Sequence, residues 1–448
     1  MDHRAGKANN STLAWVLILC LSPSVASGQS LSENITQLSG SGSVFAGSTH
    51  TRTDQGDSTD TNTEPSLGVS GNLGGQLESG AKSLTLRYNG TLETRRDQVG
   101  DEQTDSSSFT GASRFAYADP GNRFDFNLGH TVSSVRNDTG FVVNTSNFDT
   151  RNTLSAGAGL SFFPGDLTSL RFSARAGQSF GKDDLNDEES VTATSELSRR
   201  LSGRSSASLV SSRSWSENRG VDTTTDSAQF VYNRALESGS FRMGAGASRA
   251  DTKFPGGADT ENKASTGFLE RSWVAPGWRT SLQYNRSLSD SATDLSLDSP
   301  AIPEFLPDSI RVRDLVVSDS VGITHSTSRI CGACSLALGL QAERLESQTT
   351  NTDSHEYSAN LNLGVQLTNL QRLNVVYSWQ GDAGEKSGTI SEQIHRFNIS
   401  WSRQLAEDTS FGVQFNQSYL RSNLARSDQD QFAVRLVLTT GFALTGNN

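Results

Sequence analysis

The sequence predicts an all-β fold, an antiparallel β-barrel that crosses a membrane, and three observations lead to it. Apolar and polar residues alternate over most of the chain. Short turns and long polar connections follow one another in alternation. Only 33% of the 448 residues are hydrophobic, which is little for the core of a soluble protein of this length. A barrel in a bilayer needs apolar side chains only on the outward half of each strand, so it accounts for all three observations.

The alternation is clearest over residues 357–367, where every odd position is apolar and every even one is small or polar. Successive side chains of a strand point to opposite faces, so this segment has one apolar and one polar face. After a turn at 368–371, the pattern resumes with Leu373, Val375 and Tyr377 on the apolar face. Two such strands joined by a short turn form an antiparallel hairpin.

The first 28 residues have the features of a secretory signal peptide. Arg4 and Lys7 precede an apolar stretch at 13–21, and small residues follow at 26–28. We expect residues 1–28 to be removed and 29–448 to form one outer-membrane barrel domain. Cys20 leaves open a lipoprotein anchor, but Leu19 stands where a lipobox needs a small residue.

The charge and hydropathy of the remaining chain exclude other classes. Removing Asp2, Arg4 and Lys7 takes the net charge from −11 to −12, which argues against nucleic acid as a partner. Beyond the leader there is no apolar run of about 20 residues, the length that a membrane helix needs.

A strand of about 9–11 residues suffices to cross a bilayer at a barrel's tilt, and dividing the chain accordingly gives about 20 strands. Short periplasmic turns are predicted at residues 74–80, 119–122, 164–166, 201–203, 236–239, 275–277, 331–334, 368–369 and 406–408. Long polar extracellular loops are predicted at 51–62, 95–106, 136–150, 182–190, 217–226, 251–262, 289–313, 346–353, 380–391 and 421–430. The Ser-rich segments 38–50 and 191–214 alternate poorly, so about 18 strands is the main alternative.

Tryptophan supports this division of the chain. Large amphipathic rings form girdles at both membrane edges of a barrel. The predicted extracellular girdle contains Trp215 and Trp379, and the predicted periplasmic girdle contains Trp273, Trp278 and Trp401. Large aromatic residues also anchor strand ends in other sheets, so this is supporting evidence.

Six arginines share the polar parity of their strands and are predicted to face the lumen, because arginine on the lipid face is costly at mid-membrane. These lumen candidates are Arg87, Arg171, Arg175, Arg242, Arg396 and Arg435. Two interpretations stay open. The arginines line a pore that favours anions, or they pair with lumenal acids such as Asp125 and hydrate the interior.

No catalytic or metal site is predicted. His130, His325, His355 and His395 have outward parity, and no G-x-S-x-G or similar motif accompanies them, so the chain is not expected to be an enzyme. Acidic residues cluster at 54–64 and 182–189 without a calcium-binding pattern. Neither metal nor cofactor is expected.

Cys331 and Cys334 form a lone C-x-x-C in a predicted periplasmic turn. In an oxidising compartment, a disulfide that closes this turn is the simplest interpretation. Two thiolates alone make an incomplete zinc site.

Residues 162–181, 196–204 and the hairpins over 315–379 share a common style of hairpin. In these segments the chain resembles a group of porin-like outer-membrane barrels associated with exopolysaccharide and PEP-CTERM (exosortase) loci. It implies a passive role in moving or anchoring surface polysaccharide or protein. The chain departs from the usual aromatic C-terminus, because Phe442 is followed by six further residues, 443–448.

Three functional hypotheses follow. The first is a passive, porin-like channel in the outer membrane of a Gram-negative bacterium, serving exopolysaccharide export or surface-protein sorting. The second is a closed structural or adhesive barrel that binds partners through its acidic loops. A soluble β-solenoid is the third, although solenoids lack the alternation of short turns and long loops. The expected partners are outer-membrane lipid, the barrel assembly machinery and polysaccharide export components.

Overall fold

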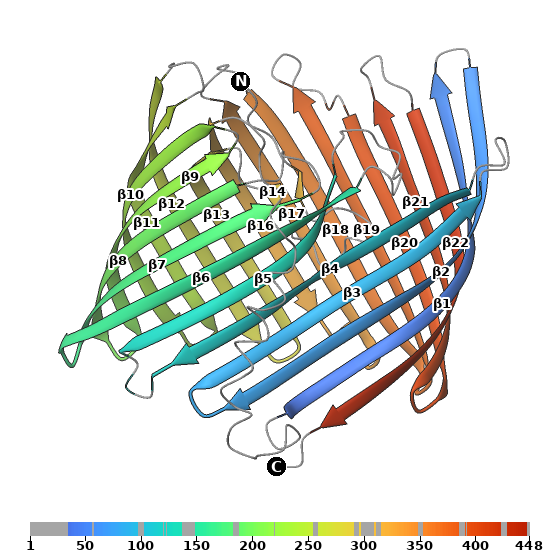
Figure 1. Ribbon diagram of the computed structural model, residues 1–448, viewed down its shortest axis with the longest axis horizontal. Coiled ribbons are helices and arrows are strands. Elements are labelled where there is room, and N and C mark those ends of the chain that lie inside the picture. The colour runs from blue at the N-terminus through green and yellow to red at the C-terminus, as the bar shows by residue number, and fades with distance from the viewer. Residues whose placement is uncertain are drawn as a thin grey trace, which may run out of the picture.

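A computed structural model shows that the chain forms one closed antiparallel barrel (Figure 1). The structure describes residues 35–55, 58–96, 103–119, 121, 123–136, 148–181, 188–218, 220–253, 259–290, 295–296, 309–310, 315–347, 353–384, 390, 392–422 and 428–445. The predicted signal peptide and Cys20 lie outside these residues. In the described part of the chain, no helix has the length and apolarity needed to cross a membrane.

The strands follow one another around the wall in chain order. Their bounds are β1 (Ile35–Gln55), β2 (Ser58–Ser79), β3 (Lys82–Arg96), β4 (Gln103–Ala118), β5 (Phe124–Arg136), β6 (Phe148–Gly165), β7 (Thr168–Phe180), β8 (Glu188–Ser202), β9 (Ser205–Asn218), β10 (Val221–Leu236), β11 (Gly239–Lys253), β12 (Asp259–Ala275), β13 (Trp278–Asp290), β14 (Leu295–Ser296), β15 (Ser309–Ile310), β16 (Leu315–Thr327), β17 (Cys334–Ser347), β18 (Asp353–Thr368), β19 (Gln371–Gly384), β20 (Glu392–Ala406), β21 (Thr409–Ser422) and β22 (Asp428–Thr445).

The barrel closes between its first and last strands. β1 pairs with β2 on one side and with β22 on the other, and the sheet contains 20 strands. β14 and β15 form a separate two-stranded ribbon. The prediction of about 20 strands is confirmed, and the alternative of about 18 is wrong. β1 begins and β22 ends at the end of the barrel that carries the short turns (Figure 1).

Alternation of side chains gives the wall two different faces. On β22, Val434, Leu436 and Leu438 are 40%, 49% and 49% exposed, and they point away from the barrel. Arg435 lies between them on the opposite, inner face. Large apolar side chains are exposed in this way on nearly every strand. Such a surface is stable in lipid and not in water.

Several predicted loops are shorter in the structure. β1 and β2 extend through most of the predicted loop 51–62, and β9 and β10 do the same at 217–226. Loop 251–262 is likewise shortened by β11 and β12. The strand boundaries predicted from the sequence lie where the apolar residues of each strand end. A strand that continues past the bilayer no longer needs apolar outward side chains, so hydrophobicity does not mark its end.

The two poorly alternating segments are regular strands. Residues 38–50 belong to β1, and residues 191–214 form most of β8 and β9. The backbone ladder provides the hydrogen bonds of a barrel whatever the side chains are. The predicted turn 74–80 is also shorter, since β2 continues to Ser79.

Two seams in the wall have the shortest ladders. β4 and β5 share eight residue pairs, from Gly111↔Val132 to Ala118↔Asp125. β12 and β13 share nine pairs, beginning at Gly267↔Arg286. Above the second seam, Ala250 and Ala264 of β11 and β12 pack against Leu288 and Val317 of β13 and β16. The seams delimit an eight-strand panel, β5 to β12.

Candidate functional site

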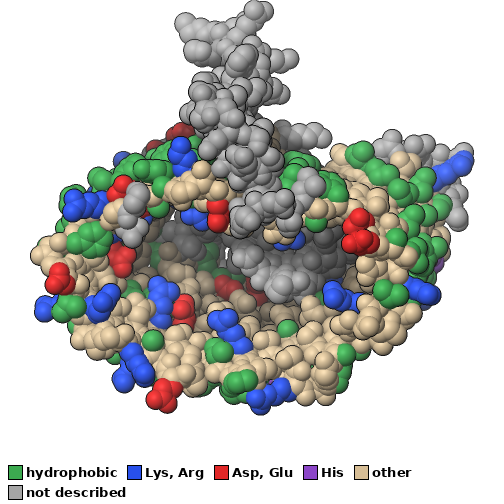
Figure 2. All heavy atoms as spheres, turned by 90° about the horizontal axis from the view of Figure 1, so that it is seen from below, with side chains coloured by type: hydrophobic (Ala, Val, Ile, Leu, Met, Phe, Trp, Pro, Cys, Tyr) green, Lys and Arg blue, Asp and Glu red, His purple; other side chains and the backbone are tan. Residues whose placement is uncertain are grey.

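The lumen is the first candidate site. Figure 2 looks into the barrel from the short-turn end and shows the wall enclosing a broad hollow. Twenty strands spaced by the usual strand separation and tilted as in outer-membrane barrels give a backbone diameter of about 40 Å. Side chains fill a barrel of about eight strands, whereas barrels of 16 to 18 leave a water channel. Wall side chains alone therefore do not close this lumen.

Among the six predicted lumenal arginines, Arg171, Arg242 and Arg435 form ion pairs across the inner wall. Arg171 Nη1 lies 2.8 Å from Asp125 Oδ2. Arg242 Nη1 lies 3.5 Å from Glu270 Oε2, and both side chains are half exposed. Arg435 Nη2 lies 2.9 Å from Glu93 Oε1.

The Arg435–Glu93 pair spans the closure of the barrel. Arg435 belongs to β22 and Glu93 to β3, so the pair bridges β1 and β2. A Cβ at Gly47 would lie 2.5 Å from the carbonyl oxygen of Val434, and one at Gly68 would collide with the Phe45 ring. These two glycines leave room for the Arg435 guanidinium, which stacks over Phe45 with its Cζ 5.0 Å from the ring centroid. The Glu93 and Arg435 side chains are only 5% and 16% exposed, so this pair is largely shielded from water.

The other three predicted arginines have small polar neighbours on the inner wall. Arg87 lies on the face of β3 opposite Leu86. Arg175 donates to the Ser155 hydroxyl at 3.4 Å. Arg396 pairs in register with Ser378 and Ser418 on the inner face of β20.

A row of lumenal carboxylates was missed by sequence reasoning. Glu343, Glu356, Asp382 and Glu392 are cross-strand neighbours on β17, β18, β19 and β20, near the long-loop ends of these strands. Neighbouring strands lie about 4.8 Å apart, so the row places four acids close together. Their sequence spacing is irregular, and only the strand register aligns them.

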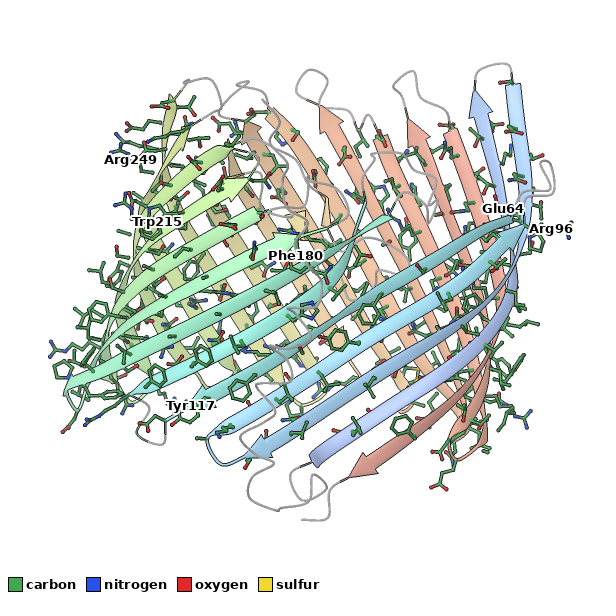
Figure 3. The ribbon with its side chains drawn as sticks, in the orientation of Figure 1. Glu64, Arg96, Tyr117, Phe180, Trp215 and Arg249 are labelled. Carbon is green, nitrogen blue, oxygen red and sulfur yellow. A yellow bond between two sulfur atoms is a disulfide. The ribbon has the colours of Figure 1, made fainter. Side chains whose placement is uncertain are left out.

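Aromatic side chains lie at both ends of the outer wall. Trp273, Trp278 and Trp401 belong to the short-turn half of their strands, and Trp215 and Trp379 to the long-loop half. In Figure 3, Trp215 lies outside the wall in the long-loop half, whereas Tyr117 lies near the short turns. That these rings form membrane girdles stays a prediction.

Histidines join these aromatic clusters. His395 stacks on Tyr419 with ring centroids 4.4 Å apart, and its Nδ1 lies 3.0 Å from the Tyr377 hydroxyl. His130 Nδ1 lies 3.0 Å from the Tyr88 hydroxyl, and its Nε2 lies 3.4 Å from the side-chain oxygen of Asn152. Contacts with tyrosine hydroxyls and an amide oxygen suit an interfacial ring rather than a nucleophile–base pair.

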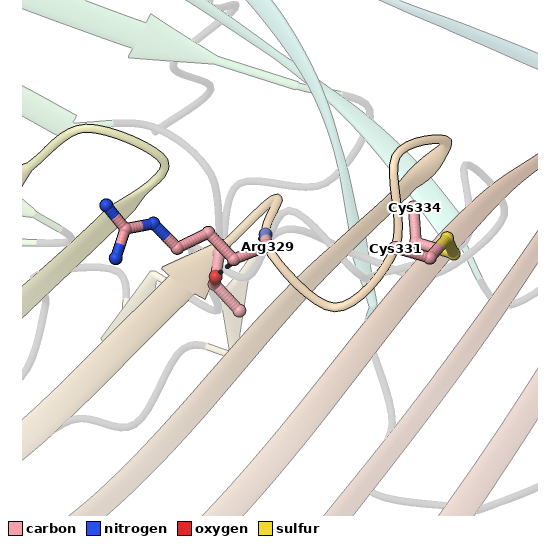
Figure 4. The surroundings of a disulfide bond; sticks show 4 residues. Arg329, Cys331 and Cys334 are labelled. Carbon is pink, nitrogen blue, oxygen red and sulfur yellow. Dashed lines mark hydrogen bonds between the residues drawn. A yellow bond between two sulfur atoms is a disulfide. The ribbon is translucent and has the colours of Figure 1, made fainter.

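Cys331 and Cys334 are joined by a disulfide in the turn between β16 and β17, with Cα atoms 5.1 Å apart (Figure 4). In the same connection, the Arg329 amide donates to the Thr327 hydroxyl at 3.1 Å. The bond therefore closes a turn at the short-turn end of the barrel.

The predicted long loop 289–313 lies largely outside the described residues. Its two short strands, β14 and β15, pair with each other, and β15 also contacts β5. β5 is on the opposite side of the ring from β13 and β16, which flank the loop.

Comparison with known proteins supports the fold. No family model and no curated protein matches the chain. Among solved structures it is similar to two mutants of the ferric enterobactin receptor PfeA of Pseudomonas aeruginosa. A double mutant has a TM-score of 0.51 at 11% identity and a single mutant 0.50 at 10%, and both alignments cover 90% of this chain and 80% of the receptor. OpdO of the same organism has a TM-score of 0.38 at 15% identity, with coverage of 90% of this chain and 97% of OpdO. The closed 20-strand sheet and its apolar outer face together show that the chain has the fold of an outer-membrane β-barrel.

Proposed function

We propose that this protein is a passive, porin-like channel of the Gram-negative outer membrane. One observation carries the proposal: a closed wall of 20 strands is apolar outside and polar inside. Hydrophilic solutes would cross through the lumen, driven by their concentration gradients. The proposed role requires no chemical step and no cofactor.

Amide and hydroxyl groups of the inner wall favour sugars and other uncharged polar solutes. Asn398 donates to Asn416 across β20 and β21, and the Ser43 and Thr439 hydroxyls lie 2.8 Å apart across β1 and β22. Such groups exchange hydrogen bonds with sugar hydroxyls at little net cost. We extend the proposal to export of surface polysaccharide or sorting of surface proteins, with export components and the barrel assembly machinery as partners.

Planar-bilayer recording of the purified, folded chain tests the channel. We expect stepwise current increases as single barrels insert, and none from heat-denatured protein. Folding is checked by heat-modifiable migration on a denaturing gel. A folded chain that inserts and gives no current would overturn the proposal and favour the closed, adhesive barrel.

Vesicle swelling tests the solute class. Vesicles that contain the protein are placed in isotonic solutions of sugars of increasing size. We expect swelling with monosaccharides and with short oligosaccharides. Vesicles that fail to swell even in monosaccharide solutions would contradict a lumen that conducts sugars. That result would not contradict an ion channel.

A further inference from the structure

The outer wall of the panel β5 to β12 is hollowed by a groove of about 1130 Å³. Its floor consists of small residues from neighbouring strands, among them Ala158, Ala174, Ala193, Ser211, Ala228 and Ala247. These alternate with residues of the inner face, such as Gly159. Arg171 and Asp125 cover the lumenal side of Gly159, and neither lines the groove, so the groove opens outward.

The groove runs obliquely across the membrane region. At one end it is bordered by Phe124, Leu160 and Phe172, which lie close to the short turns. At the other end it is bordered by Arg249 and Lys263, which lie close to the long-loop ends of β11 and β12. Its lower part is therefore in the apolar band of the wall, and its upper part is at the outer membrane edge.

Charge is concentrated at the upper end. Arg213, Asp226, Arg249 and Lys263 are successive cross-strand neighbours on β9 to β12. They are the only charged residues among the described groove lining, three cations and one acid, and the acids Asp251 and Glu261 beside the groove balance the other two positive charges. Figure 3 shows Arg249 outside the wall.

The cations are held by acids but remain accessible. Arg213 lies 3.5 Å from Asp226. Arg249 lies 3.1 Å from Asp251 and 3.2 Å from Glu261, and Lys263 lies 2.7 Å from Glu261. Even so, the Arg249 and Lys263 side chains are 48% and 68% exposed. Exposed ion pairs contribute little to stability, so an incoming anion can compete for these cations.

We propose that this groove binds a phosphate-bearing lipid of the outer leaflet. An acyl chain lies along the alanine and serine floor, and the phosphate contacts Arg213, Arg249 and Lys263. Arginine binds phosphate oxygens in a bidentate way, which suits two of the three cations. The proposal rests on the membrane location given under the proposed function, and it is independent of conduction.

A second copy of the chain fits the groove less well. Two barrels are convex and would touch along a line, which would leave the hollow unfilled. A flexible acyl chain follows a concave path. The cations lie at the long-loop end of the groove, at the membrane edge where lipid phosphates lie. This position favours a phosphate-bearing lipid over a second copy of the chain.

Native mass spectrometry of the folded protein in detergent tests the proposal, with diphosphoryl lipid A and phosphate-free diacylglycerol as the probes. We expect retention of lipid A and an affinity at least about tenfold lower for diacylglycerol, because hydrogen bonds to charged groups are the stronger ones. Equal retention of the two lipids would overturn the phosphate contact.

Two variants locate the site. Ala247→Trp fills the floor of the groove and should lower lipid A affinity at least about tenfold. Ala46→Trp adds the same ring to an exposed outer position on β1 and should leave the affinity unchanged. Equal effects of the two variants would overturn the groove as the site.

Charge is tested separately. The triple variant Arg213→Gln, Arg249→Gln, Lys263→Gln should lose affinity for lipid A but not for diacylglycerol. Arg421→Gln, which removes an outer-face arginine paired with Asp428 and Asp430 outside the groove, is the matched control. Conductance should persist in all variants because the groove is outside the lumen. A chain that conducts normally but retains no lipid A would therefore refute the lipid site and leave the channel standing.

Discussion

Strands β9–β12 and β19–β22 differ in how their outer faces end near the long loops. On β9–β12 the row is charged, with Arg213, Asp226, Arg249 and Lys263. On β19–β22 the equivalent row is Trp379, His395, Tyr419 and Asp430, which is aromatic on its first three strands. Aromatic rings belong at the headgroup level, and charges need water or phosphate. The comparison indicates that the membrane edge is built differently on two sides of one barrel.

The inner faces differ as well. β22 carries Arg435, whose pair with Glu93 is largely shielded from water. β11 carries Arg242, whose pair with Glu270 is half exposed. The same residue types therefore contribute differently to stability on the two sides.

Loss of Arg435 should give the largest effect. Arg435→Ala leaves the buried Glu93 carboxylate with Arg95, 3.2 Å away, as its remaining cation. Breaking a buried pair costs about 3–5 kcal/mol when no partner remains, so we expect a loss near the lower end of that range, about 3 kcal/mol. Arg242→Ala should cost less than about 1 kcal/mol, because its pair is exposed. Urea unfolding of both variants in lipid vesicles measures the difference. Equal losses would show that the two inner faces are equivalent.

Arginine in the lipid-facing band should be the next most disruptive change. Leu438→Arg on β22 places a charge in the apolar band and should destabilise the barrel by about 2–4 kcal/mol. Arg249→Leu on β11 should change stability by no more than about 1 kcal/mol, because Arg249 lies at the membrane edge. The same unfolding experiment applies. A small effect of Leu438→Arg would place that part of β22 outside the bilayer.

Removing the disulfide should have a smaller effect. The bond closes a loop of only four residues, so the chain-entropy model gives at most about 2 kcal/mol for Cys331→Ser with Cys334→Ser. The turn lies at the short-turn end, away from both long-loop regions, so lipid A binding and conductance should not change. A loss of conductance in the reduced protein would mean that this turn shapes the pore.

Selectivity should respond to the row of lumenal acids without loss of stability. The combined change Glu343→Gln, Glu356→Gln and Glu392→Gln should shift the ratio of cation to anion permeability toward anions, because rings of Asp and Glu favour cations. Reversal potentials in a salt gradient at about pH 8 measure it, since carboxylates are ionised there. Unchanged reversal potentials would show that ions do not pass this row.

The sequence predicts the barrel well because alternation and turn residues are local properties. The strand number follows from them, as the hairpin at 357–379 illustrates. Strand ends could not be predicted, because β1 and β2 continue as polar strands past the apolar band. The inward parity of Arg435 is visible in the sequence, but its partner Glu93 is 342 positions away. The carboxylate row and the outer groove arise only from strand register.

One face of each strand should meet lipid, and the other should meet water. Single cysteines on β22 of a chain lacking Cys331 and Cys334 test it in whole membranes with a charged maleimide that does not cross bilayers. Thr439→Cys, on the inner face, should react, and Leu438→Cys, on the outer face, should not. Equal reaction at both positions would contradict the account.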